Sequence, residues 1–404
     1  MNPHLSASDI PAGFTFAATH CGIKRSRLDL GILVSDVPAT AAAVFTKNLI
    51  VAAPVVASRE HLRKSRERMR GIIVNSGNAN CCTKEDGYPA AIAMAEKLSG
   101  ELGVARSQIL VGSTGVIGAP LRVEKIQAAV PHLALVRSAE PGAFEEFARS
   151  IMTTDTRPKW AAARCRVGGK QVRLLACAKG SGMIQPNMAT MLAYVATDAA
   201  IAAPVLDRAL RAAVEPTFNS ISVDGDTSTN DTVAVLANRK SEAPEIAKSS
   251  GADYKAFCKA LTSVCKSLAL AIVDDGEGAQ RVIEIEVRGA ASENAARQVA
   301  RTIANSPLVK TAFAGADPNW GRILAAAGRS GVRFDPSQTN IWIAGEAVCR
   351  GGREHPFDEK VAHQAMLAKY VPIRVDLGSG KASWRVWTCD FTVEYVHINS
   401  SYRT

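Results

Sequence analysis

The hydrophobic and polar positions along the chain follow two periods in turn, one typical of strands and one typical of helices. Short apolar runs that end in turn residues predict strands, and the run at 281–289 alternates most cleanly. The other predicted strands lie at 71–77, 108–118, 171–180, 190–199 and 383–404, and a polar turn leads into a strand at 222–237. Apolar residues spaced three and four apart predict helices at 88–103, 142–155, 203–216, 254–278 and 292–307.

The order of these elements indicates the fold class. Strands and helices alternate along the chain, and neither a fixed-period repeat nor a low-complexity linker interrupts them. This alternation predicts an α/β fold. The start of the alternating run at 281–289 marks a change of lobe, so we expect residues 281–404 to form a C-terminal α/β lobe.

Composition and charge narrow the function classes. The 404 residues are 47% hydrophobic, which is enough for a sizeable core. A formal net charge of +10 suits either nucleic acid or small acidic substrates. Because aromatic residues make up only 5% and the densest basic run, 61–70, is typical of a solvated helix face, we expect no nucleic-acid partner.

The cysteines, histidines and apolar runs predict no disulfide framework, metal site or membrane span. The nine cysteines are odd in number and include no repeated CxxC spacing, and the seven histidines form no HxxxH, so neither a disulfide framework nor a metal site is expected. The longest apolar neighbourhood is interrupted by Asp198 and Pro204, which argues against a membrane span. Residues 1–14 lack the features of a signal peptide, and we therefore expect a cytoplasmic protein.

The turn-rich loop 179–192, KGSGMIQPNMATML, joins two predicted strands and is the most distinctive segment. Its glycines and lysine do not follow the order of a phosphate-binding loop. One reading is a tight structural connection, with glycines for positive φ and a proline for a fixed φ. The other is a nucleophile, Thr190, whose own α-amine becomes the base once the chain is cut before it. The cut would follow attack of the Thr190 hydroxyl on the Ala189 carbonyl.

Together with other motifs, this loop resembles the processing site of the ornithine acetyltransferases, self-cleaving enzymes of arginine biosynthesis. The matching segments include VFTKN at 44–48, IVNSGNAN at 73–80, VGSTGVIG at 111–118, TTDT-x-PK at 153–159, VDGDTSTND at 223–231, DDGEGA at 274–279, SPLVKTA at 306–312, DPNWGRI at 317–323 and YVHIN at 395–399. The resemblance implies a layered α-β-β-α sandwich similar to that of the N-terminal-nucleophile enzymes.

The resemblance also assigns roles to individual residues. Thr190 would be the nucleophile, and cleavage between Ala189 and Thr190 would give an alpha chain of residues 1–189 and a beta chain of residues 190–404. Thr114 and Gly115 would form the oxyanion hole, which suits a hydroxyl and a backbone N–H in a tight turn. The substrate-binding positions, besides Thr190, would be Thr153, Lys179, Glu277, Asn399 and Thr404.

A few positions depart from the family pattern or invite another interpretation. Gln185 stands where the family has a small residue or histidine, Gln280-Arg281 replaces Thr-Lys, and Ser400-Ser401 alters the tail. The acidic run 222–231, with Asp224, Asp226 and Asp231, lacks the spacing of an EF-hand calcium loop. We interpret it as a structural turn near the active site.

The implied reaction moves an acetyl group from N2-acetyl-L-ornithine to L-glutamate by a ping-pong acyl-enzyme mechanism. It needs no metal or organic cofactor, although acetyl-CoA is an open alternative as an acetyl donor. The family suggests a heterotetramer of two alpha and two beta chains. Two rival hypotheses remain: a self-processing amidohydrolase or aminopeptidase of related fold, and a non-catalytic amino-acid-binding protein.

Overall fold

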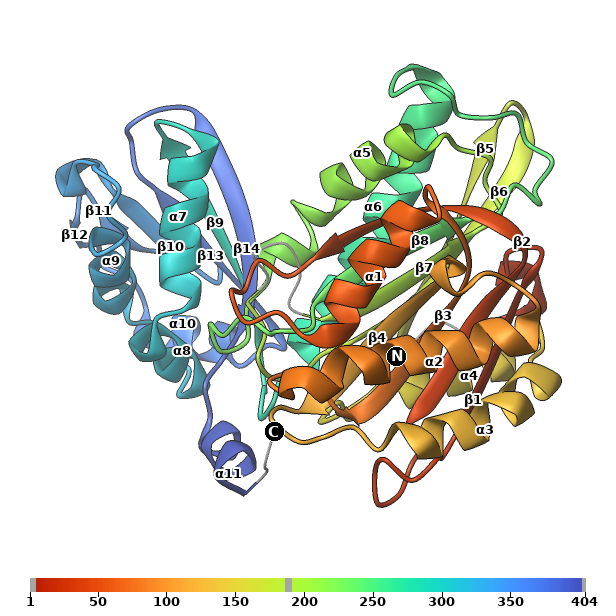
Figure 1. The fold of residues 1–404 in the computed structure, drawn as a ribbon. Coiled ribbons are helices and arrows are strands. Elements are labelled where there is room, and N and C mark those ends of the chain that lie inside the picture. Colours follow the sequence, from red (N-terminus) through yellow and green to blue (C-terminus); the bar gives the residue numbers. More distant parts are fainter. Residues whose placement is uncertain (1–4, 186–190, 402–404) are drawn as a thin grey trace.

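The computed structural model describes residues 5–185 and 191–401, which form two β-sheets with helices packed on them. Figure 1 shows the larger sheet with its helices on one side of the molecule and the smaller sheet with its helices on the other. The predicted α/β class is confirmed. Ala189, Thr190 and Thr404 lie outside the described residues, so the roles predicted for them stay predictions.

The first sheet has eight strands in the order β4-β3-β2-β8-β7-β6-β5, with β1 paired to β2. Their bounds are β1 Phe14–Thr19, β2 Leu30–Phe45, β3 Arg68–Asn78, β4 Ile109–Val116, β5 Lys159–Val167, β6 Lys170–Lys179, β7 Leu192–Thr197 and β8 Thr232–Ala237. The long strand β2 joins two halves of this sheet. Its residues 30–34 pair with both β1 and β3, whereas its residues 40–45 pair with β8.

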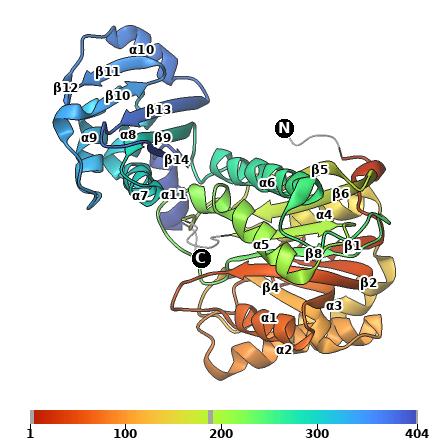
Figure 2. The same cartoon turned by 90° about the horizontal axis from the view of Figure 1, so that it is seen from above.

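The two halves of the sheet face each other and produce four layers. The apolar core between them takes side chains from β1–β4 on one side and from β6–β8 on the other. The outer face of the first half carries α1 Ala53–Lys64, α2 Lys84–Leu102 and α3 Val123–Val136, and that of the second carries α5 Ala203–Val214 and α6 Gly251–Asp274. Figure 2 shows these helix layers on opposite sides of the strands. The predicted α-β-β-α sandwich is confirmed.

Strand β7 shows how the sequence forms the two inner layers. All six of its residues are buried, and successive side chains of a strand point to opposite faces. Leu192 and Tyr194 accordingly enter the core between the sheet halves, while Ala193 and Val195 pack under α5 and α6. The continuous apolar run therefore marks a strand that is covered on both faces.

Helices α4 and α6 complete the first domain. Helix α4, Pro141–Ser150, places Phe144 and Phe147 in the core between the sheet halves. Among the described residues, α6 is the one helix long and apolar enough to cross a membrane by length and composition. It packs against β5 and β6, as a core helix does.

The second sheet forms the C-terminal α/β lobe, which confirms that part of the predicted fold. Its strand order is β12-β11-β10-β13-β9-β14. The strands are β9 Val282–Ala290, β10 Asn340–Ile343, β11 Glu346–Arg350, β12 Arg353–Glu354, β13 Tyr370–Asp376 and β14 Ala382–Cys389. The helices of the lobe are α7 Glu293–Ala304, α8 Pro307–Ala314, α9 Trp320–Gly328 and α10 Glu359–Met366. Short 3₁₀ turns occur at Ala7–Asp9, Arg106–Gln108, Phe218–Ser220 and Pro336–Gln338.

The predicted strand at 383–404 is correct only in its first part. Strand β14 ends at Cys389, and α11 follows as a helix over Val393–Ser401. The helix places Tyr395 and Asn399, four residues apart, on one face, where Tyr395 stacks on Phe391 with ring centroids 4.3 Å apart. Asn399 reaches Glu277 in the first domain. These tertiary contacts favour a helix over the strand that the alternating pattern predicts.

We predict that Phe147→Ala lowers the free energy of unfolding by about 3–5 kcal/mol, because its ring is fully buried between Phe16 and Tyr194. Urea denaturation measures the change. Leu135→Ala, at a side chain that is 82% exposed, is the control and should change it by less than about 0.5 kcal/mol. A loss at Phe147 no larger than that of the control would contradict the shared core between the sheet halves.

Candidate active site

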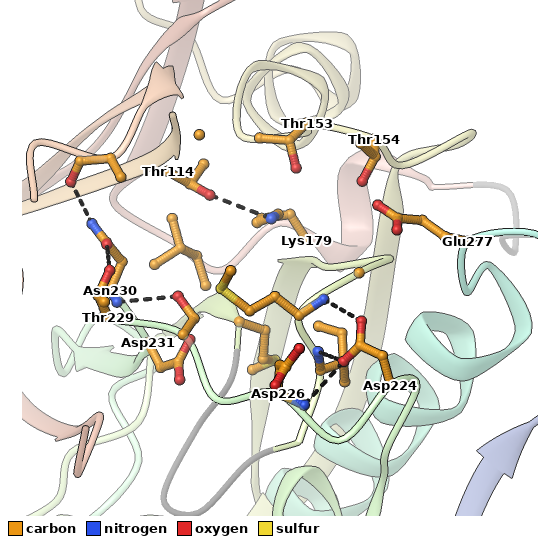
Figure 3. Close-up of a pocket in the computed structure, with 18 of the residues that line it drawn as sticks. Thr114, Thr153, Thr154, Lys179, Asp224, Asp226, Thr229, Asn230, Asp231 and Glu277 are labelled. Atoms are coloured by element: carbon orange, nitrogen blue, oxygen red, sulfur yellow. Dashed lines mark hydrogen bonds between the residues drawn. The ribbon is translucent and has the colours of Figure 1, made fainter. Parts of the chain in front are cut away.

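A cavity of about 240 Å³ opens where the first domain meets α11. Figure 3 shows its lining side chains, which come from segments far apart in the sequence. The lining includes every predicted oxyanion-hole and substrate-binding residue that the structure describes: Thr114, Gly115, Thr153, Lys179, Glu277 and Asn399. The structure therefore brings these residues to one site, and their chemical roles stay predictions.

Thr114 and Gly115 lie near the end of β4, whose last residue is Val116. Gly115 has a φ of +129°, and a Cβ at this position would lie 2.4 Å from the carbonyl carbon of Gly77. Only glycine fits this close approach of β3 and β4. The Thr114 hydroxyl faces the cavity, so the segment can offer an O–H and an N–H donor side by side.

Lys179, the last residue of β6, brings a buried amine to the cavity wall. Its Nζ lies 3.3 Å from the Thr114 hydroxyl oxygen, and its side chain is almost fully buried. Burial lowers the pKa of Lys179, and nearby Asp155 opposes this effect. A buried ammonium of this kind gains from a carboxylate placed in the cavity, which suits an amino-acid ligand.

Behind the cavity, Lys159 joins two carboxylates in a fully buried ion cluster. Its Nζ lies 2.6 Å from Asp155 Oδ1 and 2.6 Å from Asp275 Oδ2. Asp155 also accepts hydrogen bonds from the backbone N–H of Gly180 at 2.7 Å and of Thr153 at 3.0 Å. The cluster therefore fixes the backbone beside two cavity residues, Thr153 and Lys179.

The cluster also sets the charge state of Asp155. Burial alone raises the pKa of this carboxyl, but Lys159, Lys179 and the hydrogen bonds outweigh it and hold the pKa below its usual value. Asp155 and Lys159 both lie inside the motif at 153–159, but no role was predicted for them. The available signal was their closeness in sequence to Thr153, which the family resemblance implies is a substrate-binding residue.

Glu277 enters the cavity from the turn after α6. Its backbone N–H donates to the Ser181 carbonyl at 3.0 Å, and its Oε2 accepts from Asn399 Nδ2 at 2.7 Å. A Cβ on Gly182 would lie 2.4 Å from the Glu277 carboxylate, so a larger residue there would displace that side chain. Glu277 thus links the loop after β6 to α11, and its carboxylate faces the same space as Lys179 (Figure 3).

The acidic run 222–231 forms a structural turn at the cavity, as interpreted from the sequence. Asp224 accepts from the backbone N–H of Met183 at 2.6 Å and of Ile184 at 2.9 Å. Asn230 donates to the carbonyls of Ala79 and Ser113 at 2.6 Å and 2.9 Å. Within residues 5–185 and 191–401, no three acidic, histidine or cysteine side chains group as metal ligands.

We predict that Lys159→Met lowers the free energy of unfolding at pH 7 by about 3–5 kcal/mol, because two carboxylates lose their buried partner. In the native protein the depressed pKa of Asp155 stabilises the fold above pH 4, and this contribution is lost as the pH falls further. Without Lys159 the pKa of Asp155 is higher than in the native protein, because burial raises it and the strongest opposing charge is gone, so the gap in stability between variant and native protein should narrow as the pH falls.

Urea denaturation at several pH values measures both effects. Lys64→Met is the control, since the exposed Lys64 pairs with Glu60 four residues earlier in a helix. It should change the free energy of unfolding by less than about 1 kcal/mol at any pH. The role of the cluster would be contradicted if Lys159→Met lost no more free energy of unfolding than this control. It would also be contradicted if the difference in stability between Lys159→Met and the native protein widened toward pH 4.

Comparisons with known proteins place the chain in a family. The family model described as the ArgJ family matches residues 15–404. The chain is 46% identical to the arginine biosynthesis bifunctional protein ArgJ of Thermotoga neapolitana, over 98% of this chain and 100% of the relative. The protein of that name from Methylococcus capsulatus is 48% identical, over 97% of this chain and 96% of the relative.

A solved structure supports the same family assignment. The crystal structure of arginine biosynthesis bifunctional protein ArgJ from Bacillus halodurans matches with a TM-score of 0.50 at 42% identity, covering 52% of this chain and 98% of its own. The resemblance inferred from the motifs is thereby confirmed. The chain is an enzyme that belongs to the ArgJ family.

Proposed function

We propose that the chain cuts itself between Ala189 and Thr190 and then transfers an acetyl group from N2-acetyl-L-ornithine to L-glutamate. The observation that carries this proposal is the single cavity that gathers the donors of Thr114 and Gly115, the cation of Lys179 and the carboxylate of Glu277. The names of its relatives, which assign them to arginine biosynthesis, support the same pathway.

The self-cleavage step needs only the chain itself and water. The Thr190 hydroxyl attacks the Ala189 carbonyl, the peptide bond becomes an ester, and water hydrolyses that ester. Thr190 then keeps a free α-amine. Ile184 and Met191, which flank the segment that contains this bond, both line the cavity. The Bacillus halodurans chain, matched over 98% of its own length, spans only 52% of this one, as expected if relatives occur as two shorter chains.

The transfer step uses the new amine as the base. A free α-amine has a pKa of about 7.7–8.0, so a substantial fraction is neutral near pH 7. The amine takes the proton of the Thr190 hydroxyl, whose oxygen attacks the acetyl carbonyl of the donor. The Thr114 hydroxyl and the Gly115 N–H donate to the resulting oxyanion. The protonated amine then gives its proton to the leaving nitrogen of ornithine, and acetyl-Thr190 remains.

The second half of the cycle reverses these steps with glutamate as the acceptor. The glutamate amine attacks acetyl-Thr190, the same donors hold the second oxyanion, and N-acetylglutamate leaves. Lys179 binds a substrate carboxylate, and Glu277, held by Asn399, binds a substrate ammonium group. Thr153 and Thr404 complete the substrate contacts in this proposal, which requires neither a metal nor an organic cofactor.

Three finer points belong to the same proposal. Acetyl-CoA serves as a further donor if the acyl-enzyme forms from a thioester, and the word "bifunctional" in the names of the relatives supports this. The cut chains assemble as two alpha and two beta chains. The enzyme acts in the cytoplasm.

The proposal predicts that Thr190→Ala remains one uncut chain and transfers no acetyl group, because the variant lacks both the attacking oxygen and the new amine's partner hydroxyl. Thr190→Ser is the matched control, since it keeps a hydroxyl and should still be cut. Intact-mass measurement of the purified proteins shows whether the chain is cut. Incubation with labelled N2-acetyl-L-ornithine and glutamate shows whether the labelled acetyl group is transferred.

The same assay separates the rival functions. Labelled acetate without labelled N-acetylglutamate would indicate a hydrolase that passes its acyl group to water. A native chain that stays uncut, binds amino acids and turns nothing over would indicate a binding protein. Normal cutting of Thr190→Ala would remove Thr190 from the mechanism.

A further inference from the structure

Residues 183–185 of the turn-rich loop 179–192, here called the processing loop, are held by the acidic run 222–231. The backbone N–H groups of Met183 and Ile184 both donate to the Asp224 carboxylate. The Gln185 carbonyl accepts from the Thr227 hydroxyl at 3.1 Å. The backbone that leads into the processing site is therefore fixed by hydrogen bonds up to residue 185.

The side chain of Gln185 extends this anchoring to the C-terminal lobe. Its Oε1 accepts from Nδ2 of Asn305 at 2.8 Å, and Asn305 is the C-cap residue that directly follows α7. Asn305 Oδ1 in turn accepts from the Ser222 hydroxyl at 2.6 Å. The Ser222 backbone N–H donates to the Trp387 carbonyl of β14 at 2.9 Å. A continuous chain of hydrogen bonds thus runs from the processing loop into the second sheet.

The neighbouring turn leaves little room around this pair. Gly225 has a φ of +88°, and a Cβ there would lie 3.2 Å from Gln185 Oε1 and 3.7 Å from Asn305. A larger residue would crowd the two amides. Gln185 and Asn305 are each partly buried, so loss of either side chain leaves the other amide group with a missing partner.

Neither amide is placed to act on a substrate. The cavity is lined by Met183 and Ile184 from this segment, whereas Gln185 and Asn305 are not among its lining residues. Their geometry therefore suits the positioning of the loop rather than contact with reacting atoms. Gln185 is also the position of the processing loop that departs from the family pattern, and its partner Asn305, at the C-terminal end of α7, gives it a physical role.

We propose that Gln185 and Asn305 form an interlobe clamp that positions the processing loop and sets the rate of self-cleavage. This inference rests on the proposed cut before Thr190. The clamp fixes Gln185 relative to the lobe, so that fewer loop conformations compete with the one in which the Thr190 hydroxyl attacks the adjacent Ala189 carbonyl. It acts during maturation, and the cut enzyme no longer depends on it.

The test follows cleavage of freshly synthesised full-length chain over time, by intact mass. Gln185→Ala and Asn305→Ala should each cut about fivefold more slowly than the native chain, the effect of losing about 1 kcal/mol of hydrogen bonding. The double swap Gln185→Asn with Asn305→Gln conserves the summed length of the two side chains and should restore most of the rate. Once cut, each variant should show native kcat and KM.

A matched control comes from the same helix. Gln298 lies on α7 and donates to the Ser330 carbonyl at 2.7 Å, wholly within the lobe. Gln298→Ala removes one side-chain hydrogen bond of that lobe without touching the loop, so the variant should be cut at the native rate. Thermal unfolding of Asn305→Ala and Gln298→Ala measures how much each substitution destabilises the lobe.

The outcomes separate the clamp from the proposed function. Native cutting rates in Gln185→Ala and Asn305→Ala would overturn the clamp while leaving self-cleavage in place. Equal slowing in Gln298→Ala, or failure of the swap to recover any rate, would overturn it in favour of a general loss of lobe structure. A native chain that never cuts would refute the proposed function and the clamp with it.

Discussion

The architecture of the site depends on one buried cation, Lys159, held 2.6 Å from each of two carboxylates. A buried charge without a partner would cost several kcal/mol of folding free energy, whether it is the Lys159 ammonium or either carboxylate. The cluster instead satisfies its members with additional hydrogen bonds: Asp155 accepts from the backbone N–H groups of Thr153 and Gly180, and Asp275 accepts from that of Thr156. Three chain segments that supply cavity residues are therefore tied to a single point.

From this point the other features of the site follow. The loop after β6 leaves the cluster with its backbone fixed at Gly180, passes Asp224, and reaches the lobe through Gln185. The turn after α6 begins at Asp275 and delivers Glu277, which in turn holds α11 through Asn399. The layered sandwich supplies rigid strands, and these polar contacts fix the positions of the loops that connect them. Precise placement of donors is what an acyl-transfer site requires.

Much of this could be predicted from the sequence, and the failures have physical causes. Runs such as β7 and the long helix α6 carry strong local patterns, so their type was predictable. Helix α11 was predicted as a strand because the alternation of apolar and polar residues contains no information on the contacts that this helix makes with Glu277 and Phe391. The motif that contains Asp155 and Lys159 did not reveal their burial, since a charged residue gives no local sign of its partner. Gln185 was unexplained because its partner lies 120 residues away.

The central claim is that the acetyl group rests on Thr190 between donor and acceptor. The most direct test incubates the cut enzyme with N2-acetyl-L-ornithine alone and measures the intact masses of both chains. The account predicts that the chain of residues 190–404 gains one acetyl group, that fragmentation places it on Thr190, and that glutamate removes it as N-acetylglutamate. Acetyl transfer to glutamate with no acetylated chain, or with the group on another residue, would contradict the account.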